Sequence, residues 1–142
     1  MEKKKILCII SLAIFILFSR GIYLFALDRN VILSELKRLK IKVTGSAKQI
    51  EAQLPIKLSG ADWGLKKIVC EQGGYDLSAY AGKKVSLIRF PISEKYASEP
   101  LNVWVVSCND KIACVYKAVR EGSNLVPGVF PIENLKANEQ FK

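Results

Sequence analysis

Apolar and polar residues divide the chain into two parts. Residues 6–27 are almost continuously apolar, whereas the remainder alternates between short apolar runs and polar clusters. A helix made of the first stretch covers roughly 33 Å at ~1.5 Å per residue, which is enough to cross a hydrocarbon core of ~30 Å. The pattern therefore predicts a cytoplasmic stub and transmembrane segment within residues 1–27. A separate domain follows over residues 28–142, with its core at about 30–135.

The charges around the apolar stretch predict its orientation. Lys3, Lys4 and Lys5 precede the stretch and hold the N-terminus in the cytoplasm, so that the domain lies outside. Arg20 interrupts the outer half, where a long side chain can reach the lipid headgroups. A cleaved signal peptide is the competing interpretation, because small residues flank Arg20, and cleavage would make the protein secreted. The apolar character resumes after Gly21, which favours a retained signal-anchor of a single-pass membrane protein.

The outer domain begins with a stretch of helical spacing. Residues 31–40 place Ile32, Leu36 and Leu39 on one face, with charged residues elsewhere. Such a short amphipathic helix can pack on its own domain or lie on the membrane surface. We favour packing on the domain.

A second helix is predicted over residues 59–72. Ser59 and Asp62 have the spacing of a capping box, and the pair Gly73-Gly74 supplies a stop. The helical spacing turns Trp63 and Cys70 towards the flank. One face collects four residues, namely Leu65, Ile68, Val69 and Gln72.

Short apolar runs between turn-forming residues predict strands. Pro91 is expected to end one of them, and the polar residues 93–100 are expected to form a mobile loop. The fold class predicted is α+β, with two helices packed on a mainly antiparallel sheet of four to five strands. The strand segments are residues 41–43, 50–54, 83–92, 101–108 and 111–119.

The clearest hairpin turns at Asn109-Asp110, a two-residue loop between two β-prone runs. An uninterrupted register from that turn pairs Val105 with Cys114, which puts Tyr116 on the face of Val105 and Trp104 on the other face. Side chains alternate between the two faces of a sheet, so Cys108 and Cys114 are expected on opposite faces and should not bond to each other.

Composition narrows the chemistry. The net charge is +9, with basic residues spread along the chain, which is typical of a solvated face or of attraction to an anionic envelope polymer. The chain contains no histidine, which excludes Ser-His-Asp and Cys-His catalysis and the usual zinc sites. Ser86 and Lys84 lie ~6.5–7 Å apart along one strand, too far for a serine–lysine pair. We expect no catalytic residue, no metal and no cofactor, and no nucleic-acid partner.

The cysteines leave two interpretations open. Cys8 belongs to the apolar segment, and Cys70, Cys108 and Cys114 belong to the outer domain. If a disulfide forms, Cys70 with Cys114 is the favoured pair, because it joins the second helix to the covered sheet face. The alternative is three reduced, buried cysteines that pack as small apolar residues.

Three stretches resemble a known family. They are GYDLSAYAGKKV at 74–85, LNVWVVSCNDKIACVY at 101–116 and NLVPGVFPIENL at 124–135, preceded by QIEAQLPI and a helix. In this order they resemble the domain-of-unknown-function family 4830, short exported or membrane-anchored proteins of Gram-positive bacteria. The family often has a Gly-Gly pair where this chain has Ala113-Cys114. The resemblance covers most of residues 30–135 and implies topology, with no activity attached.

The function expected is that of a non-catalytic, membrane-tethered, extracytoplasmic binding or interaction module. Its partners are the cytoplasmic membrane, through residues 6–27, and a protein or an anionic envelope polymer outside it. Trp104, Val106 and Tyr96 are candidates for a recognition surface, although Trp104 can equally serve to cover the sheet. The alternatives are a structural subunit of a division or sporulation complex and, less favoured, a serine–lysine hydrolase.

Labelling of intact cells with a membrane-impermeant maleimide tests the topology. We expect Cys70, Cys108 or Cys114 to react from outside the cell, before or after mild reduction and denaturation. A retained anchor keeps the full-length mass in the membrane fraction. Labelling that requires cell lysis would place the domain in the cytoplasm instead.

Overall fold

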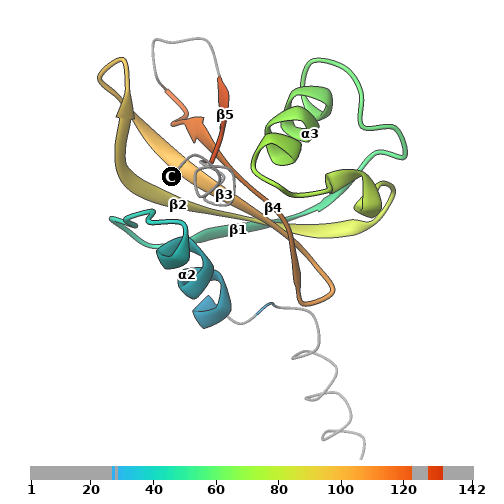
Figure 1. Ribbon diagram of the computed structural model, residues 1–142, viewed down its shortest axis with the longest axis horizontal. Helices are drawn as coiled ribbons and strands as arrows, with labels where there is room; N and C mark the ends of the chain where they lie inside the picture. Colours follow the sequence, from blue (N-terminus) through green and yellow to red (C-terminus); the bar gives the residue numbers. More distant parts are fainter. Residues whose placement is uncertain (1–26, 28, 123–127, 133–142) are drawn as a thin grey trace, which may run out of the picture.

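The computed structural model of the chain describes residue 27 and residues 29–122 and 128–132. Two helices pack against a five-stranded antiparallel sheet with the strand order β1-β2-β3-β4-β5 (Figure 1). This confirms the predicted α+β fold. The elements are α2 (Arg29–Arg38), β1 (Lys48–Gln53), α3 (Trp63–Gln72), the 3₁₀-helix η1 (Leu77–Tyr80), β2 (Lys84–Tyr96), β3 (Glu99–Cys108), β4 (Lys111–Val119) and β5 (Val129–Pro131).

The predicted transmembrane segment falls almost wholly outside the described residues, and so do Lys3, Lys4, Lys5 and Arg20. Within the described part of the chain, every helix is too short or too polar to cross a membrane.

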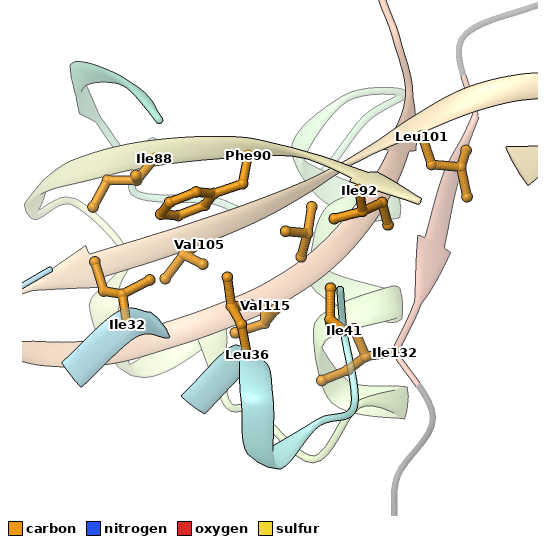
Figure 2. Packing of buried hydrophobic residues seen from close by; sticks show 11 residues of the cluster. Ile32, Leu36, Ile41, Ile88, Phe90, Ile92, Leu101, Val105, Val115 and Ile132 are labelled. Atoms are coloured by element: carbon orange, nitrogen blue, oxygen red, sulfur yellow. The ribbon is translucent and has the colours of Figure 1, made fainter. Parts of the chain in front are cut away.

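The sheet is covered on both faces, one by each helix. Ile32 and Leu36 of α2 pack on a core that includes Phe90, Val105 and Val115 (Figure 2). We call this side the α2 face. The opposite side, the α3 face, packs under α3 and η1 and contains, among others, Val69, Cys70, Leu77, Val85, Leu87, Val106 and Cys114. Because both faces are covered, the strands are rich in apolar residues at successive positions.

Pro91 does not end its strand, and the mobile loop predicted over residues 93–100 was wrong. The N–H and C=O of one residue point to the same side of a strand. The carbonyl oxygen of Pro91 accepts the N–H of Thr44 (2.8 Å), so the missing proline donor faces away from β3. The ladder between β2 and β3 therefore resumes beyond Pro91 and ends at a tight turn, Ala97-Ser98, where φ is 47° and 69°.

Two other strand predictions need correction. Residues 41–43 contribute one isolated bridge, between Val43 and Ile92, in place of a strand. The β3–β4 turn at Asn109-Asp110 is confirmed, with φ of 47° and 61°. The register beyond it was wrong, because Ala113 forms a bulge between the pairs Ser107–Ile112 and Val106–Cys114.

The bulge changes which side chains share a face. Val105 pairs with Val115, and Cys114 pairs with Val106. Cys114 therefore lies on the α3 face together with Cys108, and the prediction that these two cysteines point to opposite faces was wrong. Tyr116 moves to the α3 face for the same reason.

Helix α3 ends where predicted but starts later and is rotated. It begins at Trp63, and Asp62 makes no side-chain cap hydrogen bond. Val69 and Cys70 are buried, whereas Leu65 and Ile68 are 51% and 50% exposed. The helical spacing alone predicts that the more apolar face, with Leu65 and Ile68, packs on the sheet. The helix is instead attached through Cys70, so the face that carries Val69 and Cys70 is the buried one.

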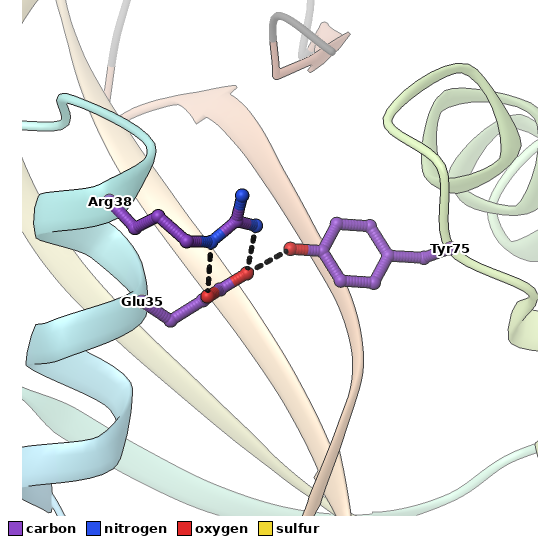
Figure 3. A network of polar contacts seen from close by, with 3 residues as sticks. All are labelled: Glu35, Arg38 and Tyr75. Atoms are coloured by element: carbon purple, nitrogen blue, oxygen red, sulfur yellow. Dashed lines mark hydrogen bonds and ion pairs between the residues drawn. The ribbon is translucent and has the colours of Figure 1, made fainter. Parts of the chain in front are cut away.

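The two helix layers are joined by a polar network (Figure 3). The phenol of Tyr75, which follows α3, donates to a carboxylate oxygen of Glu35 in α2 (2.9 Å). The same carboxylate accepts from the Arg38 guanidinium at 2.6 Å and 2.8 Å. These hydrogen bonds, that from Arg38 above all, lower the pKa of Glu35 against the opposing effect of burial. Tyr75 also packs against the apolar cores of both faces, so it ties the two layers together.

We predict that Glu35→Gln lowers the free energy of unfolding at pH 7 by about 1 kcal/mol, the contribution of partly exposed charge-assisted hydrogen bonds. Because the folded-state pKa of Glu35 lies below its ordinary value of 4.5, its stabilisation is complete above that pH. It is lost as the pH falls through the folded-state pKa. Urea unfolding of both proteins at neutral and acidic pH measures this difference.

Glu71→Gln is the matched control, because Glu71 forms an exposed pair with Lys67 at 3.6 Å. We expect it to cost less than about 0.5 kcal/mol. A Glu35→Gln deficit of the same size at both pH values would show that the carboxylate charge contributes nothing.

Candidate functional site

Helix α3 leaves part of the α3 face uncovered, and this part forms a cleft of about 490 Å³. Its floor comes from four strands, with Ile50, Leu87, Trp104, Tyr116 and Ala118. Ala61, Asp62, Leu65 and Lys66 at the start of α3 form part of its wall, together with Val129 of β5. We call it the aromatic cleft. Its volume lies within the ~300–1,000 Å³ of sites that bind small ligands or single peptide side chains.

Two aromatic residues form the centre of the floor. Trp104 and Tyr116 are directly paired across β3 and β4, and their rings are nearly parallel, with centroids 6.4 Å apart. Burial raises the pKa of Tyr116 above its ordinary value, and the nearby Asp62 carboxylate raises it further. The phenol, which is already protonated at neutral pH, therefore keeps its proton in more alkaline solution than an ordinary tyrosine.

Ion pairs neutralise the rim of the aromatic cleft. Lys66 binds Asp62 at 2.5 Å and also lies over the Trp63 ring, 4.4 Å from its centroid. Across the cleft, Arg89 pairs with Glu121 at 3.3 Å. The floor between these two pairs is apolar, which suits a large apolar or aromatic group.

A second cleft, of about 420 Å³, continues along the same face of the sheet. The two clefts share Glu121. Lys48, Arg89 and Arg120 give the second cleft three positive charges against the one carboxylate of Glu121. We call it the basic cleft, and its remaining lining residues are Gly45, Ser46, Pro91 and Asn102.

The recognition surface predicted from the sequence does not form. Trp104 lies in the aromatic cleft, but Val106 is fully buried beneath α3. Tyr96 packs on Phe130 instead, with ring centroids 4.6 Å apart. Sequence reasoning missed Tyr116, because an uninterrupted register placed it on the face of the sheet that Trp104 does not share. Leu87 and Arg89 share one face of the same strand, and one is apolar and the other basic. This change of character along one face was the signal that could have indicated an apolar cleft next to a basic one.

The serine of the rejected serine–lysine pair has other partners. Ser86 is buried, donates to the Glu51 carboxylate and accepts from the Gln49 amide at 2.9 Å. Lys84 is exposed, and the hydrogen bonds of the described residues do not join it to Ser86. In the same part of the chain, the Cys, Asp and Glu side chains form no group of three or more that could hold a metal.

A disulfide between Cys70 and Cys114 holds the wall of the aromatic cleft in place. It joins α3 to β4 with Cα atoms 5.5 Å apart, and both side chains are fully buried. This is the pair favoured from the sequence, although Cys114 lies on the face of the sheet opposite to the one that the uninterrupted register predicted. Cys108 is a free, buried thiol. Besides Cys70, Val69 is the other buried apolar residue of α3, so the disulfide carries much of the attachment of this helix.

No protein-family model, no curated protein and no solved structure matches the chain. The resemblance to the domain-of-unknown-function family therefore stays a prediction. What the two clefts bind has to be inferred from their own geometry and charge.

We predict that replacing Cys70 and Cys114 together by alanine lowers the free energy of unfolding by about 2–4 kcal/mol, as expected for a cross-link that closes a long loop. The two residues are 44 positions apart. Urea unfolding of the wild type with and without reductant, and of the double variant, measures the loss. Cys108→Ala is the control and should respond to reductant like the wild type. A double variant as stable as the oxidised wild type would contradict the prediction.

Proposed function

We propose that the protein is a non-catalytic binding module, tethered outside the cytoplasmic membrane by residues 6–27. Its aromatic cleft binds an extended segment of a partner protein. The observation that carries this proposal is the exposed part of the α3 face, with Trp104 at its centre, in a sheet whose apolar surface is otherwise covered. Open apolar surface of this kind costs solubility unless a partner uses it.

The two clefts follow one another along β2, and this arrangement favours an extended polypeptide as the ligand. Leu87 lies in the aromatic cleft, Arg89 lies two residues further along β2, and Pro91 lies at the far end of the basic cleft. At ~3.3 Å per residue, these positions cover roughly 13 Å, the length of about four extended residues. A strand-like segment presents every second side chain to such a groove. A compact ligand would fill one cleft and leave the other empty.

The polar groups near the clefts support binding over catalysis. Ser86 lies on the other side of the sheet, hydrogen-bonded to Glu51. Cys108 is a buried thiol whose sulfur contacts the carbonyl oxygen of Lys84, and the hydrogen bonds of the described residues give it no basic partner. Activation of such nucleophiles needs an adjacent base. The partly exposed indole of Trp104 provides apolar contact surface with a hydrogen-bond donor, which is a property of a recognition site, and the buried Tyr116 ring supports it from the neighbouring strand.

Selection from a phage-displayed library of random linear peptides tests the proposal, with the full-length protein in lipid nanodiscs as the target. We expect the selected peptides to bind the wild type and to bind Trp104→Ala about tenfold or more weakly, since central aromatic residues dominate such sites. Ile50→Lys, a change at an exposed floor residue, should weaken binding similarly without disturbing the core.

Ile56→Ala is the control, because Ile56 is 85% exposed and lies outside both clefts. Unfolding midpoints check that each variant is folded. Peptides that bind the cleft variants as tightly as the wild type, or a selection that enriches nothing, would refute the proposed site.

A further inference from the structure

The basic cleft has a fixed position relative to the aromatic cleft. Lys48 pairs with Arg89 across β1 and β2, two residues beyond the pair of Ile50 with Leu87. Side chains two residues apart along a strand lie on the same face and ~6.6–7 Å apart. An extended segment that runs along these strands with one side chain over Ile50 and Leu87 therefore carries its second-next side chain over Lys48 and Arg89. Trp104 pairs with Arg89 across β2 and β3, so its ring lies beside this second position.

Arg120 is held in place before any ligand arrives. Its Nε donates to the carbonyl oxygen of Leu101 at 3.3 Å, and its Nη2 donates to that of Ile92 at 3.4 Å. A guanidinium has five N–H donors in a fixed plane, so donors remain for a further acceptor. Among the described residues, no carboxylate forms an ion pair with Arg120 or with Lys48.

The one carboxylate at the basic cleft is replaceable. Glu121 pairs with Arg89, but its side chain is 81% exposed and the contact is a long one, at 3.3 Å. A surface pair of this kind is worth little. A ligand carboxylate that binds Arg89, Lys48 and Arg120 together would face three positive charges, and Glu121 can move into solvent.

We infer that the basic cleft is the subsite for an acidic side chain. The partner segment would then be an extended chain with a large apolar or aromatic residue and an aspartate or glutamate two positions away. This inference rests on the proposed binding function and names the chemistry of its ligand. Arg89, Arg120 and Lys48 bind the carboxylate, and the aromatic cleft binds the apolar side chain.

Three capped, dye-labelled peptides test the spacing. Each has a threonine background and one leucine, with glutamate two positions after the leucine, glutamate one position after it, or glutamine two positions after it. Binding to the full-length protein in phosphatidylcholine nanodiscs is measured by fluorescence anisotropy. We expect the first peptide to bind about tenfold more tightly than the other two, and this preference to shrink at high salt.

Variants of the basic cleft identify the residues. Lys48→Gln and Arg120→Gln should each remove most of the preference for glutamate over glutamine while leaving the glutamine peptide bound. Lys111→Gln removes the same charge from an exposed residue outside both clefts and should leave the preference unchanged. Unfolding midpoints separate a local effect of Arg120→Gln from a loss of folding.

The remaining outcomes each overturn a different statement. Equal binding of all three peptides, abolished by Trp104→Ala, would overturn the acidic subsite and leave the proposed function standing. Binding of poly-glutamate or inorganic polyphosphate as tightly as the leucine–glutamate peptide would make the site one for anionic polymers and overturn the inference. Peptide binding that is unaffected by Trp104→Ala would refute the proposed function and the inference with it.

Discussion

Two ten-residue helices have to cover both faces of a sheet whose longest strand has 13 residues. A helix of that size is ~15 Å long, whereas the strand extends over ~43 Å. Neither helix can therefore cover its face from end to end. On the α2 face, the chain between α2 and β1 contributes Ile41 and Val43 to the core. The α3 face keeps an uncovered portion, and the aromatic and basic clefts lie there. The candidate site therefore exists because α3 is shorter than the sheet face on which it packs.

The helices also need attachments beyond their own apolar residues. Each has two buried side chains, Ile32 and Leu36 in α2 and Val69 and Cys70 in α3. The disulfide fixes α3 to β4, and Tyr75 connects the segment after α3 to Glu35 of α2. A small domain gains little stability from its core, so one cross-link and one polar network are a large part of what holds these layers together. Both attachments also keep the α3 wall of the aromatic cleft at a fixed height above the sheet.

Much of this fold was predictable from local patterns, and the errors have identifiable causes. The amphipathic spacing of Ile32 and Leu36 and the turn at Asn109-Asp110 are short-range signals, and both were interpreted correctly. The strand beyond Pro91 was missed, because the harm done by a proline depends on which neighbour its missing donor faces. The candidate site was harder still. Trp104 was noted, but its partner Tyr116 was placed on the wrong face, because nothing in the local sequence marks Ala113 as a bulge.

The bulge at Ala113 links two properties that look independent. Cys114 reaches Cys70, and Tyr116 reaches Trp104, because one extra residue in β4 turns both side chains to the α3 face. Side-chain direction in a strand has a period of two residues. Loss or gain of a single residue between the turn and Cys114 would take away the covalent cross-link and the aromatic floor together, whereas a change of two residues keeps both. Whether the number of residues between the turn and Cys114 is odd or even therefore matters more for the cross-link and the aromatic floor than the identity of any one of these residues.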